Sequence, residues 1–238
     1  MFQAVIFDLD GLLIDSEPLW RDTEVKVFGA LGLPITHQDC EQTIGLRVDE
    51  FVRYWYDRFP WKGKSLQVVE QEIVEEMIFC IRQRGVPKAG VEKIFNFFAE
   101  KQLPMAVASS SYVRIIEAAL QTLGLLPHIT LFHSAEHETF GKPHPAVYLT
   151  TARKLNVDPV RCLAFEDSPM GVQSAKSAGL TCVCIPDSIV DQTKLSQADL
   201  LLESLEVFND EHLTALARAE EVGLKKPGLK KPGLKKSG

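Results

Sequence analysis

The sequence has few cysteines, and their spacing matches no disulfide or metal-binding motif. The five cysteines, at positions 40, 80, 162, 182 and 184, are odd in number and include no Cys-x-x-Cys motif. This pattern indicates neither a disulfide framework nor a zinc site. Cys182 and Cys184 would share one face of a strand, and we interpret them as core residues. A reducing, cytoplasmic environment is therefore expected.

Long apolar runs are also absent. No segment approaches the roughly eighteen apolar residues that a membrane span needs, and no basic start followed by an apolar stretch marks an export signal. With 238 residues, 45% of them hydrophobic, the chain is long enough to bury a sizeable core. We therefore expect a globular protein without a membrane partner.

Positive charge is scarce except at the C-terminal end. The net charge is −6, yet residues 224–238, LKKPGLKKPGLKKSG, carry six lysines and no acid, so residues 1–223 hold −12. An acidic body argues against a nucleic-acid partner. The five-residue repeat suits neither a helix nor a strand, and its prolines and glycines predict a disordered basic tail outside the fold.

Five short apolar runs predict buried strands of a parallel sheet. Stretches of helical periodicity separate the later runs, and Ser111 is the predicted N-cap of one of them. This alternation predicts an α/β fold with a Rossmann-like, doubly wound parallel sheet. The predicted strands are 3–7, 104–109, 129–134, 161–165 and 180–185, and the predicted helices are 90–101, 111–124, 145–156 and 169–178.

Residues 16–86 break this alternation. Their apolar residues follow a helical period, and no strand is evident among them. We therefore predict an α-helical cap domain, residues 16–86, inserted into a core domain formed by residues 1–15 and 87–223. Such an insertion should lie over the carboxyl end of the first strand, which is where open α/β sheets bind ligands.

Acidic side chains follow two of the predicted strands. Asp8 and Asp10 come after the first apolar run, and Glu166 and Asp167 come after the fourth. An Asp-Gly turn facing water would explain the first pair, and a helix start would explain Glu166. However, the carboxyl ends of parallel strands meet at one edge, where these carboxylates would repel one another unless a cation lay between them. Their oxygen ligands suit Mg²⁺ rather than zinc.

Two more strand ends carry groups that can bind phosphate. Ser109, Ser110 and Ser111 lie at a helix start, where hydroxyls and free backbone N–H groups bind anions, although N-capping alone would explain one of them. Lys142 stands in GKPHP, where two prolines stiffen the loop, one loop before the Glu-Asp pair. A solvated lysine is the alternative, but its position favours a place at the same sheet edge.

Taken together, FDLDG, ASSS, GKPHP and FEDSPMGVQSAKSAG resemble, in order and in spacing, the four motifs of the haloacid dehalogenase superfamily of phosphotransferases. The resemblance spans residues 3 to about 190. The helical insertion resembles the cap of the branch that contains β-phosphoglucomutase and small sugar-phosphate phosphatases. Within the insertion, LLIDSEPLW and GLRVDEFVRYW look most like bacterial hexitol-phosphate and 2-deoxyglucose-6-phosphate phosphatases.

The resemblance implies a phosphoric monoester hydrolase that depends on Mg²⁺. Asp8 would be the nucleophile and would form an aspartyl-phosphate, while the Asp10 side chain would protonate the leaving sugar oxygen and then deprotonate the attacking water. Lys142 and Ser109 would bind the phosphoryl oxygens. The implied ligands of Mg²⁺ are Asp8, the main-chain carbonyl of Asp10, and Asp167, with Glu166 in support.

The cap should select the leaving group, a small phosphorylated sugar or sugar alcohol. Arg47 is the candidate for binding sugar hydroxyls and Trp20 for a stacking wall, with Ser110 beside the phosphate, although a surface salt bridge and cap packing remain alternatives for the first two. β-Phosphoglucomutase carries a histidine where this chain has Trp20, which favours a phosphatase over a hexose-phosphate mutase. A non-catalytic phosphate-binding module is the lowest-ranked alternative. A monomer is expected for this branch.

Overall fold

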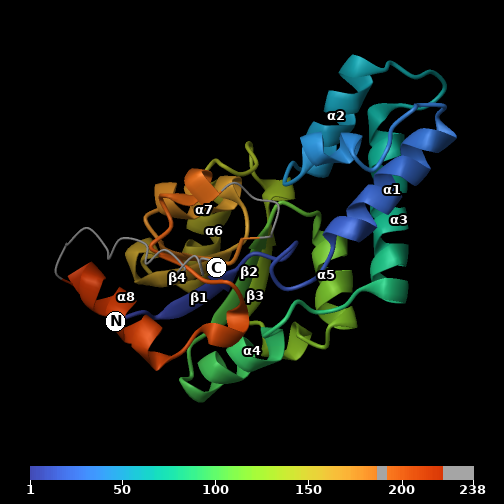
Figure 1. Cartoon of the computed structure of the whole chain (residues 1–238). Helices are drawn as coiled ribbons and strands as arrows, with labels where there is room; N and C mark the ends of the chain where they lie inside the picture. Colours follow the sequence, from blue (N-terminus) through green and yellow to red (C-terminus); the bar gives the residue numbers. More distant parts are fainter. Residues whose placement is uncertain (187–191, 222–238) are drawn as a thin grey trace, which may run out of the picture.

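The computed structural model describes residues 1–186 and 192–221, so the basic tail predicted for 224–238 lies outside the described residues. Six parallel strands form one sheet in the order β3-β2-β1-β4-β5-β6, with helices on both faces (Figure 1). The predicted α/β fold with a doubly wound parallel sheet is therefore confirmed. The strands are β1 (Ala4–Phe7), β2 (Met105–Ser109), β3 (Leu131–Ser134), β4 (Cys162–Glu166), β5 (Thr181–Cys184) and β6 (Leu200–Leu201). The helices are α1 (Glu17–Ala30), α2 (Val48–Arg58), α3 (Leu66–Arg84), α4 (Val91–Glu100), α5 (Val113–Thr122), α6 (Ala146–Leu155), α7 (Pro169–Ser177) and α8 (Asp210–Glu221).

Strand β1 is buried on both faces, and its side chains alternate between two core layers. Phe7 belongs to the layer under α4, α5 and α8, whereas Ile6 belongs to the layer under α6 and α7. In the first layer, the ring of Phe7 stacks against the rings of Phe95 and Phe165, each with its centroid 5.2 Å away. Because both faces are covered, the strand reads as an uninterrupted apolar run in the sequence.

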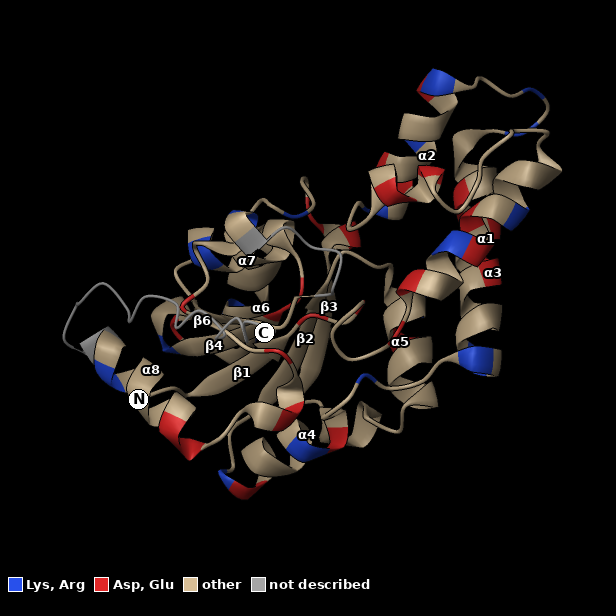
Figure 2. Ribbon diagram, in the orientation of Figure 1, with Lys and Arg blue, Asp and Glu red and all other residues tan. Residues whose placement is uncertain are grey.

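Residues 17–84, which we name the helical insertion, contain α1, the short 3-10 helix η1 (Asp39–Thr43), α2 and α3, and no strand. Helix α3 packs against α1 and α2, and also against α5 of the sheet layer, so it joins the insertion to the rest of the chain (Figure 1). Phe28 and Trp55 lie in the apolar centre of the insertion. Acidic residues occur along all three helices (Figure 2).

The structure differs from the sequence prediction at three places in the fold. Strand β6 and helix α8 were not predicted, because a strand of two residues carries no periodic signal and α8 is only partly buried. The predicted N-cap at Ser111 is wrong, since Tyr112 occupies the N-cap position of α5. The hydroxyl of Ser111 instead bonds a carboxylate of the sheet edge, as described below.

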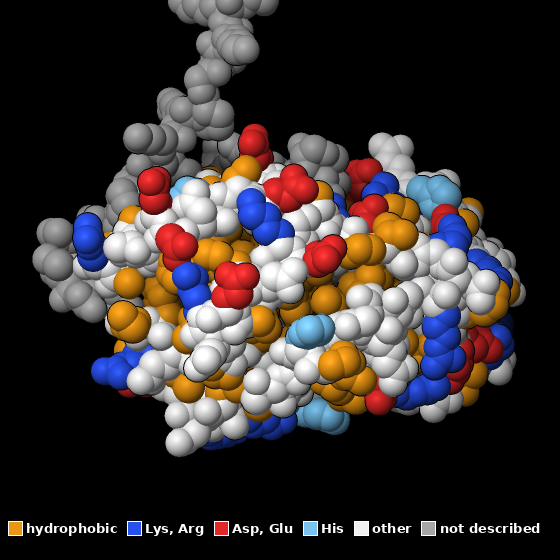
Figure 3. Space-filling model, turned by 90° about the horizontal axis from the view of Figure 1, so that it is seen from below, with side chains coloured by type: hydrophobic (Ala, Val, Ile, Leu, Met, Phe, Trp, Pro, Cys, Tyr) orange, Lys and Arg blue, Asp and Glu red, His pale blue; other side chains and the backbone are white. Residues whose placement is uncertain are grey.

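No helix within residues 1–186 and 192–221 has both the length and the apolar composition of a membrane span. Seen from the side on which α4 lies, apolar side chains are interspersed with charged and polar ones (Figure 3).

Candidate active site

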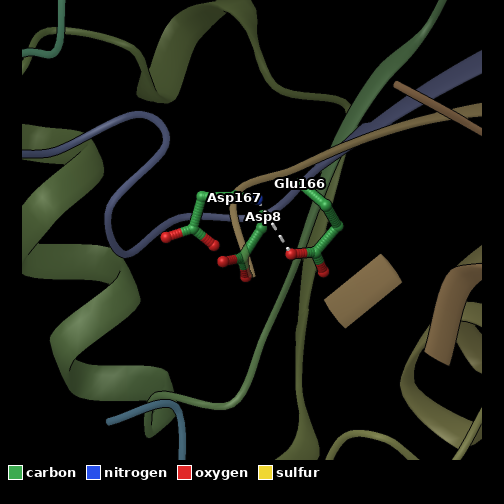
Figure 4. Close-up of side chains that lie close together, drawn as sticks. All are labelled: Asp8, Glu166 and Asp167. Atoms are coloured by element: carbon green, nitrogen blue, oxygen red, sulfur yellow. Dashed lines mark hydrogen bonds between the residues drawn. The ribbon is translucent and has the colours of Figure 1, made fainter. Parts of the chain in front are cut away.

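Two strand ends bring carboxylates together at one edge of the sheet. Strands β1 and β4 pair with Phe7 opposite Phe165, so the residues that follow them, Asp8 and Glu166, lie close together. Oxygen atoms of Asp8, Glu166 and Asp167 all lie within 4.8 Å of one another (Figure 4). The structure thus brings together the two acidic motifs that lie far apart in the sequence.

Two glycines allow these carboxylates to approach so closely. Gly11 has a φ of +75°, and a Cβ atom at this position would lie 2.2 Å from Oδ2 of Asp167. A Cβ atom at Gly171, in the first turn of α7, would lie 1.9 Å from Oε2 of Glu166. The hydroxyl of Ser168 fixes this turn by accepting a 3.1 Å hydrogen bond from the backbone N–H of Gly171. A side chain at either glycine would displace a carboxylate.

Lys142 is a buried cation that lies between two of the acids. Its ammonium donates hydrogen bonds to Oδ1 of Asp8 at 2.7 Å and to Oε1 of Glu166 at 2.6 Å. The hydroxyl of Tyr148, on α6, also donates to Glu166. Glu166, which does not line the cavity described below, therefore fixes the position of the Lys142 ammonium. Tyr148 was not predicted, because one aromatic residue on an amphipathic helix is usually a core residue.

Positive charge is in short supply in this cluster. Burial raises the pKa of Asp8 to about 7, since the Lys142 ammonium, which lowers it, is opposed by the charges of Glu166 and Asp10. Burial, followed by the charges of Asp8 and Glu166, also raises the pKa of Asp167 well above its usual value. Burial alone would lower the pKa of Lys142, but the charges of Asp8 and Glu166 outweigh burial and raise it. The single positive charge of Lys142 therefore does not neutralise the negative charges of the acids around it.

The donor set of the cluster fits a hard divalent cation. Asp8 and Asp167 offer carboxylate oxygens, and Gly11 leaves room for them to meet. Neither histidine nor cysteine joins this cluster in the part of the chain that the structure describes. Oxygen-only ligands favour ions such as Mg²⁺ or Ca²⁺ over zinc.

Asp10 lies in surroundings that differ from those of Asp8. Its Oδ2 accepts hydrogen bonds from Oγ of Ser111 at 2.7 Å and, more weakly, from Oγ of Ser109 at 3.4 Å. Its Oδ1 accepts a 2.9 Å hydrogen bond from Nε1 of Trp20 on α1. The two neighbouring aspartates thus have different partners, which suits different chemical roles.

A cavity separates this sheet edge from the helical insertion. The predicted site residues that line it are Asp8, Asp10, Trp20, Ser109, Ser110, Lys142 and Asp167. Glu166 lies behind this lining and is fully buried. The insertion also contributes Glu24 and Thr43 to the wall, which the sequence did not reveal. An acid within a charged amphipathic helix looks like an ordinary surface residue until the fold shows which face it occupies.

Arg47 is the one predicted site residue whose contacts lie away from the cavity. Its guanidinium donates to the carbonyl oxygens of Ala135 and Glu138 at 3.0 and 2.9 Å, and it forms two hydrogen bonds with Asp49 at 3.0 and 2.8 Å. These contacts tie the start of α2 to the loop after β3. Arg47 therefore joins the insertion to the sheet layer. Its contact with a sugar hydroxyl stays a prediction.

Comparison with known proteins agrees with the motifs. The model of the haloacid dehalogenase-like hydrolase family matches residues 2–179. Hexitol phosphatase B of Escherichia coli (strain K12) is 37% identical over 204 residues, which cover 85% of this chain and 92% of that protein. Validoxylamine A 7'-phosphate phosphatase of Streptomyces hygroscopicus subsp. limoneus is 30% identical over 205 residues, with 86% and 95% covered.

Solved structures share the fold. CbbY from Rhodobacter sphaeroides, determined in complex with phosphate, matches with a TM-score of 0.81 and 22% identity, and the match covers 87% of this chain and 96% of CbbY. At that identity the likeness speaks for the architecture alone. The family match, by contrast, spans most of the chain and includes all four motifs and the acidic cluster. The chain belongs to the haloacid dehalogenase-like hydrolase family.

Proposed function

We propose that this chain hydrolyses small phosphorylated sugars or sugar alcohols, in a Mg²⁺-dependent reaction that passes through an aspartyl-phosphate on Asp8. The observation that carries the proposal is the meeting of Asp8, Asp167 and Lys142 at one end of a cavity whose other wall comes from the helical insertion. Similarity to the hexitol phosphatase over most of both chains supports a sugar-alcohol phosphate as substrate.

In the first half of the reaction, an oxygen of Asp8 attacks phosphorus and the ester P–O bond breaks. Asp10 gives a proton to the departing sugar oxygen. Lys142 and Ser109 bind the phosphoryl oxygens, on which negative charge accumulates in the transition state. Because Glu166 holds the Lys142 ammonium from behind, this cation is already in place when phosphate arrives.

In the second half, water attacks the phosphorus of the aspartyl-phosphate and the bond to Asp8 breaks. Asp10, now without its proton, takes one from the attacking water, so the enzyme returns to its starting state. The hydrogen bonds that Asp10 accepts from Trp20 and Ser111 fix the position of its carboxyl group for both transfers.

Mg²⁺ would be held by the carboxylates of Asp8 and Asp167 and by the main-chain carbonyl of Asp10, with Glu166 behind them. When bound, the ion supplies positive charge that reduces the repulsion between Asp8 and the anionic substrate. The raised pKa values of Asp8 and Asp167 support this assignment, because they indicate acids that lack a counter-charge.

We also propose that residues 16–86, which include the helical insertion, act as a cap domain that selects the leaving group. The core domain, 1–15 and 87–223, would carry the phosphoryl chemistry. The position of the cavity, between the helical insertion and the sheet edge, supports this division of roles.

Phosphate release from sorbitol 6-phosphate, fructose 1-phosphate and glucose 6-phosphate, with Mg²⁺ or with EDTA, tests the proposal. We expect release with Mg²⁺ and none with EDTA. Asp8→Asn should lower kcat by at least about a thousandfold, since it removes the nucleophile. Asp57→Asn, at an exposed aspartate of α2, is the matched control and should keep full activity.

Acid quenching during turnover should trap one phosphoryl group on the wild-type protein, which mass spectrometry detects, and none on Asp8→Asn. Conversion of β-glucose 1-phosphate to glucose 6-phosphate without phosphate release would instead identify a mutase. Binding of phosphate esters without turnover of any of them would identify a non-catalytic module, and the phosphatase proposal would then be rejected.

A further inference from the structure

Glu24 faces the cavity from the side opposite the acidic cluster. It lies on α1, one helical turn after Trp20, and only 4% of it is exposed. Residues four apart lie on the same face of a helix, and both of these side chains line the cavity. Trp20 donates a hydrogen bond to Asp10, and Glu24 lies one turn further along α1. The two side chains therefore form a wall of the cavity that begins at Asp10 and ends at Glu24.

The carboxyl group of Glu24 has more acceptor capacity than its neighbours fill. Nε1 of Trp55 donates to its Oε2 at 3.0 Å. The hydroxyl of Thr43 lies 3.1 Å from Oε2 and 3.4 Å from Oε1, but its single proton has a shorter contact with the Cys40 carbonyl at 2.9 Å. The Cys40 thiol lies 3.3 Å from the Thr36 carbonyl. Oε1 therefore has only a long contact with the Thr43 hydroxyl, at 3.4 Å, and keeps further acceptor capacity.

A structural role alone does not account for this arrangement. A carboxylate has about four acceptor positions, and the contacts of Glu24 with Thr43 and Trp55 leave some of them open. Trp55 needs only an acceptor, which an uncharged side chain would also provide. A hydroxyl group of a ligand in the cavity would complete the contacts of Glu24.

We propose that Glu24 determines substrate specificity by binding hydroxyl groups of the leaving polyol, so that long sugar or sugar-alcohol phosphates are preferred over short esters. This inference rests on the proposed phosphatase function. A helix rises about 1.5 Å per residue, so Glu24 lies about 6 Å beyond Trp20 along α1. Only a leaving group several carbon atoms long reaches that far from Asp10.

The test compares kcat/KM for sorbitol 6-phosphate with kcat/KM for glycerol 3-phosphate, which is too short to reach Glu24. In Glu24→Gln, a variant of nearly equal size, the ratio of the two values should fall about tenfold, equivalent to about 1.4 kcal/mol, mainly through a higher KM for sorbitol 6-phosphate. Glu41→Gln makes the same charge change at an exposed residue of η1, and should keep the wild-type ratio.

Trp55→Phe separates recognition from packing, because it removes the indole donor and leaves the carboxyl group. We expect it to keep the wild-type ratio within about threefold. If Glu24→Gln keeps the wild-type ratio, or if Trp55→Phe reduces it equally, Glu24 is structural and the inference is overturned while the phosphatase function stands. Wild-type protein that hydrolyses none of these esters would overturn both proposals.

Discussion

Nε1 of Trp20 donates a 2.9 Å hydrogen bond to Oδ1 of Asp10, so a residue of the helical insertion holds a carboxyl group of the sheet edge. Asp10 thereby depends on the position of α1. If Asp10 is the acid and base of the reaction, proton transfer is efficient only while the insertion and the sheet edge are in this arrangement.

Trp20→Phe should lower kcat/KM for sorbitol 6-phosphate about tenfold, because a hydrogen bond worth about 1.5 kcal/mol positions the carboxyl group that protonates the leaving oxygen. The loss should be smaller for p-nitrophenyl phosphate, whose leaving group departs without a proton. Trp61→Phe is the matched control, since the Nε1 atom of Trp61 is buried without a hydrogen-bond partner among the described residues. Equal losses with both substrates would contradict the positioning of Asp10 by Trp20.

Mg²⁺ should stabilise the wild-type fold, and Asp167→Asn should abolish that effect. In the absence of metal, Asp167→Asn should melt at a higher temperature than the wild type, because burial and the repulsion from Asp8 and Glu166 penalise the charge of Asp167. Differential scanning fluorimetry with a Mg²⁺ titration measures both effects. Asp57→Asn should respond to Mg²⁺ like the wild type, and a Mg²⁺-induced shift that survives Asp167→Asn would exclude Asp167 as a ligand.

Glu24 should make the free energy of unfolding fall as the pH rises. Burial raises its pKa from 4.5 to about 7, although hydrogen bonds from Trp55 and Thr43 lower it in part. Between these two values the folded state binds more protons than the unfolded state, so stability decreases across this window and the penalty is complete above about pH 7. At 1.36 kcal/mol per pKa unit, the contribution is roughly 3 kcal/mol.

Glu24→Gln removes this titration. Urea unfolding at pH 5 and pH 8 should therefore show that the stability of the variant, measured relative to the wild type, increases by up to roughly 3 kcal/mol between the two pH values. Glu41→Gln, at an exposed site, should show no such increase. A difference between variant and wild type that stays constant with pH would mean that Glu24 titrates normally in the folded protein.

Arg47→Met should weaken catalysis without changing substrate preference. The guanidinium bonds the loop after β3 and Asp49, so its loss should loosen the insertion and lower kcat/KM by a similar factor, about threefold to tenfold, for sorbitol 6-phosphate and glycerol 3-phosphate. Arg58→Met, at an exposed arginine of the same helix, is the control. A loss confined to sorbitol 6-phosphate would return Arg47 to the role of a sugar-binding residue.

The sequence predicted the sheet and its acidic edge because both depend on short-range patterns. A run of buried residues followed by acids marks the end of β1 and of β4, and parallel pairing then forces Asp8 and Glu166 together. Lys142 was found by the same reasoning, from its place in the loop that follows β3 and precedes α6.

The contacts that cross from the insertion to the sheet edge could not be predicted. Trp20 and Ser111 both donate to Asp10. These contacts depend on the directions of the side chains, which the periodicity of the sequence does not encode. Glu24, on α1, and Arg47, the N-cap residue of α2, show the same limit, since only the packing of these helices decides which charged side chains face the cavity.

The glycine at position 11 has a consequence for sequence variation. Because even a methyl group there would occupy the place of the Asp167 carboxylate, a saturation library should tolerate substitutions at this codon as poorly as at Asp8 itself. Gly171, pressed against Glu166, should behave in the same way. These two glycines, which have no reactive atom, would then tolerate substitution as poorly as the catalytic residues do, because they contribute the space that the carboxylates occupy.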